Sequence, residues 1–293
     1  MKLRARSRTR RLAAIAVAAG TAALSLTVPA AAEAAAPLDY VALGDSYSAG
    51  SGVLPLDPDA SLLCLRTTRN YPHVLAQKTG ADLTDVTCGG AETKHFTQSQ
   101  YPGVPAQLDA VNAGTDLVTL TIGGNDNGTF INAILACGTA GVGTLGFGSP
   151  CKDQYGSRFT DEITTNTLPR LRESLRAIKA KAPNARVAIL GYPWIMPASY
   201  DWTCFVKMPI ARGDVPYLRS LQAHLNSAVQ QAAGETGATY VDMSAASEGH
   251  DACASSGTRW IEPVLFGTNL VPVHPNASGE AAMAQRTASV LGL

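Results

Sequence analysis

Short apolar runs alternate with stretches of helical apolar spacing along most of the chain. The apolar runs predict strands over residues 40–43, 83–87, 116–122, 186–190 and 239–243. Apolar residues spaced three and four apart predict helices over residues 71–79, 162–181, 215–233 and 276–291. Because strands that alternate with helices form parallel sheets with helices on both faces, we expect an α/β fold around a central parallel sheet.

The first 36 residues follow a different pattern. Basic residues crowd positions 2–11, an apolar stretch follows over 12–28, and alanines occupy most of positions 30–36. This order is typical of a secretory signal peptide, with cleavage expected within residues 32–36. A membrane anchor is the alternative. It is disfavoured by the small and polar residues inside the apolar stretch, Gly20, Thr21, Ser25 and Thr27.

The rest of the chain shows no internal division. It contains no repeat of about 20–50 residues, and no stretch is rich enough in glycine, proline or serine to act as a linker. Residues 37–293 are therefore predicted to form one domain.

Removal of the signal peptide would change the charge of the protein. The whole chain has 23 basic and 23 acidic side chains. Six of the basic and one of the acidic side chains lie in residues 1–36. The remaining 17 basic and 22 acidic side chains give residues 37–293 a net charge of about −5. This charge disfavours nucleic acid and anionic membranes as partners. No later stretch is long and apolar enough to predict stable insertion into a membrane.

All six cysteines lie beyond the signal peptide. An even number in an exported chain predicts disulfides, although six cysteines allow many pairings. We favour sequential pairing, because each bond then closes a surface loop of modest length. The pairs are Cys64–Cys88, Cys137–Cys151 and Cys204–Cys253. Metal ligation is the alternative. The absence of Cys-x-x-Cys and Cys-x-x-His spacings disfavours it, so no metal site is expected.

Glycine-bearing polar turns follow three of the predicted strands. They are Gly44-Asp45-Ser46, Gly89-Gly90 and Gly123-Gly124-Asn125. In an open parallel sheet, ligands bind beyond the carboxyl ends of the strands. We therefore expect these turns to converge on a site at one edge of the sheet.

These turns contain the parts of an acyl-transfer site, which needs a nucleophile, a base and donors for the oxyanion. Ser46 offers a hydroxyl group, Gly90 an uncovered backbone N–H and Asn125 a side-chain N–H. Histidine is the base suited to neutral pH, and His274 lies on a turn between two prolines, directly before the last predicted helix. The other histidines lie within predicted helices or in loops without a supporting pattern: His73, His224, His95 and His250.

Four ordered blocks carry a resemblance to a known family. They are Leu43-Gly44-Asp45-Ser46-Tyr47-Ser48-Ala49-Gly50, Cys88-Gly89-Gly90-Ala91-Glu92-Thr93, Ile122-Gly123-Gly124-Asn125-Asp126 and Val273-His274-Pro275-Asn276-Ala277-Ser278-Gly279. In these blocks, which span nearly all of residues 37–293, the chain resembles the SGNH (GDSL) hydrolase superfamily. It is most similar to secreted actinobacterial esterases and lipases with three disulfides. One Gly-Asp-Ser alone is a weak signal, whereas four blocks in order after predicted strands are specific.

The resemblance implies a fold and a set of roles. The fold would be a three-layer α/β/α sandwich of the flavodoxin-like kind. Ser46 would be the nucleophile and His274 the general base. The backbone N–H groups of Ser46 and Gly90, with the Asn125 side chain, would form the oxyanion hole. No cofactor is implied.

The chain departs from the family pattern near its histidine. Many members carry an aspartate three residues before it, where this chain has Val271, and some secreted relatives use a backbone carbonyl there. We expect the Val271 carbonyl to accept the Nδ1–H of His274, which leaves a Ser-His dyad. The alternative is a distant acid, Glu262 or Asp251, that completes a triad.

Two further sequence features allow more than one interpretation. Residues 141–146 match Gly-x-Gly-x-x-Gly but follow no strand and open no predicted helix, so a flexible disulfide-closed loop is favoured over a cofactor site. Several large apolar residues follow the strand at 186–190, namely Trp194, Trp202, Phe205 and Met208. They indicate either a covered sheet edge or an apolar wall for an acyl chain.

We therefore expect a secreted, monomeric serine hydrolase that acts on small-molecule or lipid carboxylic esters, as an esterase or lipase or as a phospholipase A. Deacetylation of polysaccharides or small molecules is an alternative, which a groove of exposed aromatic residues would favour. A secreted binding protein without turnover is an alternative of another class. The joint presence of the site residues disfavours it: Ser46, Gly90, Asn125 and His274.

Overall fold

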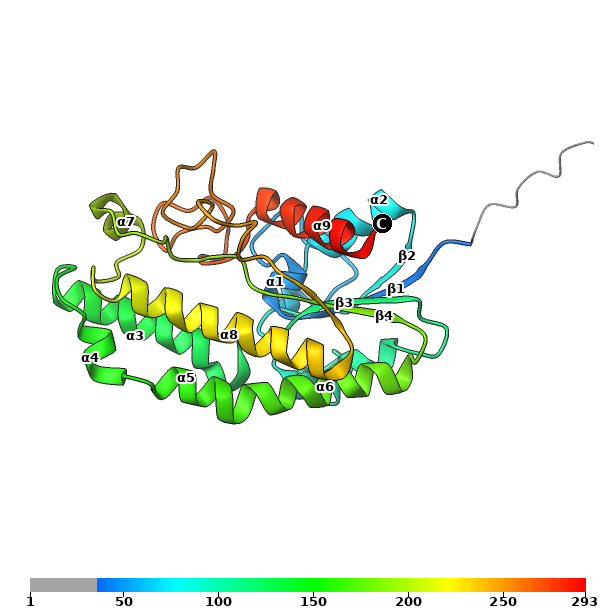
Figure 1. Cartoon of the computed structure of the whole chain (residues 1–293). Coiled ribbons are helices and arrows are strands. Elements are labelled where there is room, and N and C mark those ends of the chain that lie inside the picture. Colours follow the sequence, from blue (N-terminus) through cyan, green and yellow to red (C-terminus); the bar gives the residue numbers. More distant parts are fainter. Residues whose placement is uncertain (1–35) are drawn as a thin grey trace, which may run out of the picture. The chain divides into compact units, whose positions relative to one another are not determined.

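The computed structural model describes residues 36–293, which form a five-stranded parallel sheet with helices on both faces (Figure 1). The strands are β1 (Asp39–Gly44), β2 (Asp82–Asp85), β3 (Leu117–Thr121), β4 (Arg186–Leu190) and β5 (Thr239–Val241). The helices are α1 (Ser46–Ala49), α2 (Tyr71–Thr79), α3 (Thr129–Gly143), α4 (Pro150–Tyr155), α5 (Arg158–Glu162), α6 (Leu168–Lys181), α7 (Trp202–Lys207), α8 (Val215–Thr236) and α9 (Ala277–Leu291). The signal peptide expected at residues 1–36 lies, except for Ala36, outside the described residues.

The order of the strands places the expected site. The sheet runs β2-β1-β3-β4-β5, so the chain leaves β1 toward one edge and returns on its other side as β3. In the parallel register, Gly44 at the end of β1 pairs with Thr121 at the end of β3. The carboxyl ends of β1 and β3 therefore flank the point at which strand order reverses, where open α/β sheets bind ligands.

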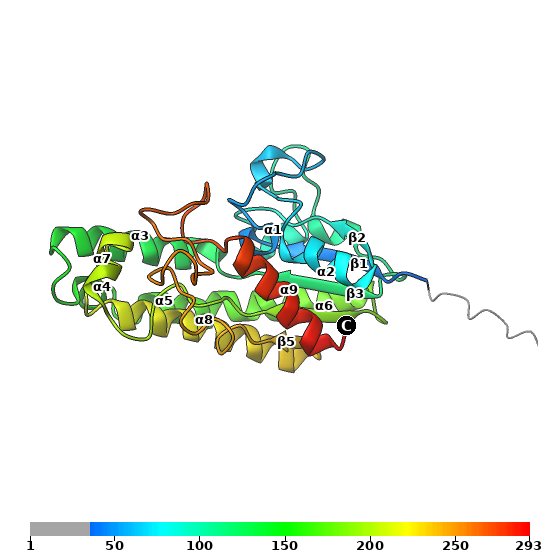
Figure 2. The same ribbon diagram turned by 90° about the horizontal axis from the view of Figure 1, so that it is seen from above.

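Two pairs of helices make the outer layers. Helices α2 and α9 pack together on one face of the sheet, and α6 and α8 pack together on the other (Figures 1 and 2). The apolar runs of β1 and β3 lie between them and are buried from Tyr40 to Leu43 and from Leu117 to Leu120. Strands buried on both faces read as continuous apolar runs, which is why they were visible in the sequence. The predicted α/β/α sandwich is confirmed.

The structure differs from the prediction over residues 141–146. These residues were expected to form a flexible loop, but Gly141, Val142 and Gly143 belong to the last turn of α3, and only residues 144–146 form a turn. A side chain at Gly141 would collide with the carbonyl oxygen of Pro209. The glycine there permits close packing of two backbones rather than flexibility.

Three disulfides fasten the segments between the sheet elements. They join Cys64 to Cys88, Cys137 to Cys151 and Cys204 to Cys253, which is the sequential pairing. The second ties α3 to α4, and the third ties α7 to the segment that follows β5.

A buried carboxyl group joins α2 to α9. Glu280, in the first turn of α9, is fully buried, and its Oε2 accepts a hydrogen bond of 2.7 Å from the Tyr71 backbone N–H at the start of α2. Its Oε1 has no partner within residues 36–293. Burial raises the pKa of Glu280 well above its usual value, because the charged form loses its hydration. The folded protein therefore favours the protonated side chain.

This group should make stability depend on pH. Because the pKa is higher in the folded state, the contribution of Glu280 is complete below its unfolded pKa and is lost as the pH rises toward its folded pKa. We expect Glu280→Gln to reduce the fall in the free energy of unfolding between pH 5 and pH 8 by about 1 kcal/mol or more. Urea denaturation at both pH values measures this fall in the free energy of unfolding. The exposed Glu173→Gln is the control, and an equal effect there would contradict the assignment.

Candidate active site

A tight turn carries Ser46 from the end of β1 into the first position of α1. The turn requires Gly44, whose φ is +123° and where a side chain would collide with the carbonyl oxygen of Thr121. Asp45 caps the helix, since its Oδ1 accepts a hydrogen bond of 3.0 Å from the backbone N–H of Tyr47. Ser46 is thereby held against the neighbouring strand.

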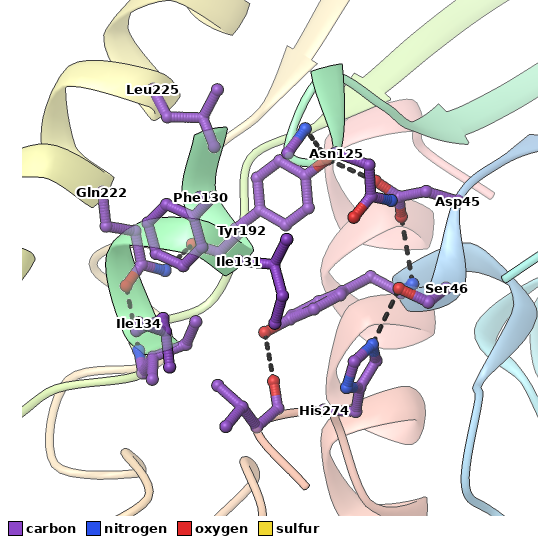
Figure 3. A pocket seen from close by; sticks show the side chains of 14 residues that line it. Asp45, Ser46, Asn125, Phe130, Ile131, Ile134, Tyr192, Gln222, Leu225 and His274 are labelled. Atoms are coloured by element: carbon purple, nitrogen blue, oxygen red, sulfur yellow. Dashed lines mark hydrogen bonds between the residues drawn. The ribbon is translucent and has the colours of Figure 1, made fainter. Parts of the chain in front are cut away.

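His274 lies opposite Ser46, as Figure 3 shows. Its Nε2 is 2.7 Å from the Ser46 Oγ. The histidine comes from the segment before α9, which Asn276 caps by accepting the backbone N–H groups of Ser278 and Gly279. The structure thus joins two residues that are 228 positions apart in the chain.

The prediction that the Val271 carbonyl orients His274 is wrong. The His274 Nδ1 lies 2.8 Å from the carbonyl oxygen of Pro272. The reason is the backbone of Val273, whose φ of +62° turns the chain back so that the nearer carbonyl meets the ring. A β-branched residue in this region costs about 1–3 kcal/mol. The Tyr47 hydroxyl, which donates to the Val273 carbonyl at 2.7 Å, helps to hold the turn.

Neither of the two distant acids is hydrogen-bonded to His274. The Glu262 carboxylate accepts from the Arg259 guanidinium at 2.7 Å, from the Asn276 amide and from the Thr268 backbone N–H. Asp251 accepts from the backbone N–H of Cys253 at 2.9 Å. Among residues 36–293, the only side chain bonded to the imidazole is therefore Ser46.

These contacts define the state of the imidazole. A carbonyl only accepts hydrogen bonds, so Nδ1 carries the hydrogen toward Pro272 and Nε2 is left to accept the Ser46 hydroxyl proton. Burial lowers the pKa of His274, and the Pro272 carbonyl opposes this less strongly. The ring is consequently neutral near pH 7 and able to take a proton.

The other two turns meet beside Ser46. The Asn125 Nδ2 donates to the Ala91 carbonyl at 3.1 Å. Asp126 accepts both the backbone N–H and the hydroxyl of Thr93 at 2.8 Å, which ties the turns together. Within residues 36–293, the backbone N–H groups of Ser46 and Gly90 donate to no protein atom.

A pocket opens beside these groups and is shown in Figure 3. Its lining includes Ser46, Asn125 and His274, whereas Gly90 lies outside it, in the adjoining turn. The rest of the wall is mostly apolar and comes from α3, α8 and the segments after β4 and before His274: Phe130, Ile131, Ile134, Ile195, Leu225 and Val273.

Most of the apolar wall thus comes from α3 and α8 rather than from the segment after β4 that the sequence suggested, which contributes Ile195. Trp194 and Met208 are buried elsewhere, Trp202 is half exposed and Phe205 is partly buried, and none of the four lines this pocket. The wall residues of α3 could have been found from the apolar spacing of Phe130 and Ile134, which is helical.

A buried tyrosine, which the sequence interpretation missed, connects the turns after β1, β3 and β4. The Tyr192 hydroxyl donates to the Asp45 Oδ2 at 2.5 Å and accepts the Gly124 backbone N–H at 3.0 Å. Burial raises the pKa of Asp45 to about 6, although hydrogen bonds from Tyr192, Thr121 and Tyr47 oppose the rise. A polar residue directly after a strand, in Gly191-Tyr192-Pro193, was the available signal.

Residues 36–293 contain no group of three or more His, Cys, Asp or Glu placed to hold a metal ion. None of their helices combines the length and the apolar character that crossing a membrane requires.

Comparisons with known proteins agree with this geometry. A model of the GDSL-like lipase/acylhydrolase family matches residues 42–282. The chain is 69% identical over 264 residues to Lipase 2 of Streptomyces coelicolor, across 90% of this chain and 89% of that protein. The crystal structure of phospholipase A1 from Streptomyces albidoflavus aligns with a TM-score of 0.72 and 29% identity, across 87% of this chain and 99% of that one. An extracellular lipase from Streptomyces rimosus aligns with a TM-score of 0.70 and 29% identity, across 86% and 99%.

The position of Tyr192 leads to a testable expectation. Tyr192→Phe leaves the Asp45 Oδ2 and the Gly124 N–H without a buried partner, so we expect a loss of about 1–3 kcal/mol in the free energy of unfolding. The pKa of Asp45 should rise further, because the hydroxyl favours the charged carboxylate. Urea denaturation and carboxyl NMR titration measure the two effects. Tyr217→Phe removes an exposed hydroxyl bonded to Gly156 and is the control, and equal losses would contradict the role.

Proposed function

Because the chain belongs to the GDSL-like lipase/acylhydrolase family, it is an ester-hydrolysing enzyme, and we propose that it cleaves carboxylic esters through an acyl-enzyme on Ser46. The observation that carries this proposal is the 2.7 Å contact between the Ser46 Oγ and the His274 Nε2. The family predicted from the four sequence blocks is confirmed, since the match over residues 42–282 includes all of them.

In the first step, the Ser46 Oγ attacks the ester carbonyl carbon while the His274 Nε2 takes its proton. Negative charge then develops on the carbonyl oxygen. The backbone N–H groups of Ser46 and Gly90 and the Asn125 side chain donate to it. The tetrahedral intermediate expels the alcohol, which receives the proton from His274, and the acyl group remains on Ser46.

In the second step, water replaces the alcohol. His274 removes a proton from the water, which attacks the acyl carbon, and the proton returns to Ser46 as the acid leaves. The Pro272 carbonyl holds the imidazole in one tautomer throughout. A neutral carbonyl stabilises the imidazolium less than a carboxylate, so this dyad depends more heavily on the oxyanion donors.

We propose a lipid ester as the substrate. The pocket next to Ser46 is lined by aliphatic and aromatic side chains from α3 and α8, which suit an acyl chain. A polysaccharide deacetylase would need polar groups and exposed rings for sugar, and the wall formed by Ile131, Ile134 and Leu225 offers neither. The lipase and the phospholipase A1 from Streptomyces, to which the chain is similar, support an acyl-chain substrate.

We further propose that the protein acts outside the cell. Three disulfides are characteristic of exported proteins, because cytosolic thiols are kept reduced. The signal peptide predicted for residues 1–36 and the extracellular lipase of Streptomyces rimosus support the same location.

The proposed role of Ser46 as nucleophile is tested with an alkyl fluorophosphonate and with the substrate p-nitrophenyl butyrate. We expect the phosphonate to label Ser46 at neutral pH, and Ser46→Ala or His274→Ala to lower kcat about 10⁴-fold or more. The exposed Ser278→Ala is the matched control and should keep full activity. An unlabelled wild-type protein, or a Ser46→Ala variant that retains its rate, would contradict the acyl-enzyme.

The dyad is tested by removing the acids one at a time. Because neither carboxylate contacts His274, we expect Asp251→Asn and Glu262→Gln to lower kcat by less than about 100-fold. Thermal melting separates a lost fold from a lost function, since Glu262 forms a buried ion pair with Arg259. A loss of several thousand-fold in a folded variant, about the size expected for an orienting acid, would show that a triad operates.

A further inference from the structure

Large apolar side chains are exposed together beyond the carboxyl end of the sheet. We call them the apolar face: Val142, Leu145, Phe147, Trp202, Val206, Leu265 and Phe266. Each is between 48% and 73% exposed, although such residues are ordinarily buried. A contiguous cluster of this kind marks a surface that is covered in use.

Three separate segments form the apolar face. The rings of Phe147 and Trp202 are 5.4 Å apart, which joins the turn after α3 to α7. The backbone N–H of Leu265 donates to the Lys207 carbonyl at 2.9 Å, which joins α7 to the segment that carries Phe266. Figures 1 and 2 both show the end of α3, helix α7 and the orange segment before α9 at the same end of the domain.

These segments are almost free of charge. Residues 127–151 contain no Lys, Arg, Asp, Glu or His, and residues 263–279 contain only His274. The ammonium group of Lys207, at the end of α7, donates hydrogen bonds to the carbonyls of Cys253 and Ala254. Its charge therefore does not project from the face. Asp201, which caps α7, and Arg212, whose guanidinium lies over the Tyr200 ring beside Trp202, are opposite in sign, so the face complements a surface without net charge.

The apolar face is connected to the catalytic pocket through α3. Ile131, Leu135 and Val142 are exposed, and at about 100° per residue they lie within about 40° of one another around the helix. Ile131 also lines the pocket beside Ser46. A stripe of apolar side chains thus runs from the face to the mouth of the pocket.

We propose that the apolar face docks on a zwitterionic phospholipid bilayer, from which Ser46 takes its ester. This rests on the proposed function, because a water-insoluble substrate must reach the pocket from such an aggregate. Exposed Trp and Phe side chains with no opposing charge suit the boundary between water and acyl chains. The stripe on α3 then gives an acyl chain an apolar path to the pocket.

Binding is measured without turnover, with Ser46→Ala as the parent protein and phosphatidylcholine vesicles in a flotation assay. We expect Leu145→Ser, Phe147→Ser and Phe266→Ser, combined in this parent, to weaken partitioning about tenfold or more. Leu62→Ser with Leu63→Ser is the matched control, because these exposed leucines belong to a turn outside the face. Raising salt from low to molar concentration should not release the parent, since no charge attraction is involved.

A direct signal checks that the face itself enters the lipid. Tryptophan emission of the parent should shift to shorter wavelength on addition of the vesicles, and Trp202→Phe should abolish the shift. This readout does not depend on the folding of the triple variant. A shift that persists in Trp202→Phe would contradict docking through α7.

Other outcomes overturn the proposal. If the parent does not bind the vesicles, or if the Leu62/Leu63 control loses as much binding as the triple variant, the apolar face is not the docking surface. So would a parent that sediments as a dimer and becomes monomeric when Leu145, Phe147 and Phe266 are changed, because a second copy would then cover it. With Ser46 restored, the triple variant should hydrolyse soluble p-nitrophenyl butyrate normally and vesicle lipid poorly. Docking without Ser46-dependent hydrolysis would contradict the proposed function alone.

Discussion

The active-site geometry depends on the register that sets the end of β1 beside the end of β3. In this register Gly44 lies so close to Thr121 that no side chain fits, and the Asp45 backbone N–H donates to the Thr121 carbonyl at 2.9 Å. The Thr121 hydroxyl also donates to the Asp45 carboxylate at 2.7 Å. With Tyr192 on the other carboxylate oxygen, one buried acid positions the turns that follow three strands.

The histidine is held by a different means. Its segment is anchored by the buried pair of Arg259 and Glu262, and backbone hydrogen bonds join Glu262 to Val273 and His274. Glu262 therefore supports the backbone rather than the imidazole. Because burial lowers the pKa of His274 and a neutral carbonyl orients it, the imidazole is kept uncharged without a carboxylate.

Helix α3 links the chemistry to the surface. Its pocket side supplies Phe130, Ile131 and Ile134 beside Ser46, and its far end continues into Leu145 and Phe147 on the apolar face. Gly141 lets this helix approach the backbone at Pro209, and a disulfide ties it to α4. Exposure of an uncharged helix at such a place costs solubility, and the proposed docking on a lipid bilayer would account for it.

Local patterns in the sequence were enough to predict the alternating elements, the α/β class, the family and the turns that carry Ser46, Asn125 and His274. Local spacing and the order of the blocks report these features, because strands and helices have fixed periods. The tertiary structure alone decided that Pro272 orients His274, that Tyr192 joins the turns and that α3 walls the pocket. These depend on one positive φ at Val273 and on contacts between residues distant in the chain, and neither leaves a periodic signal in the sequence.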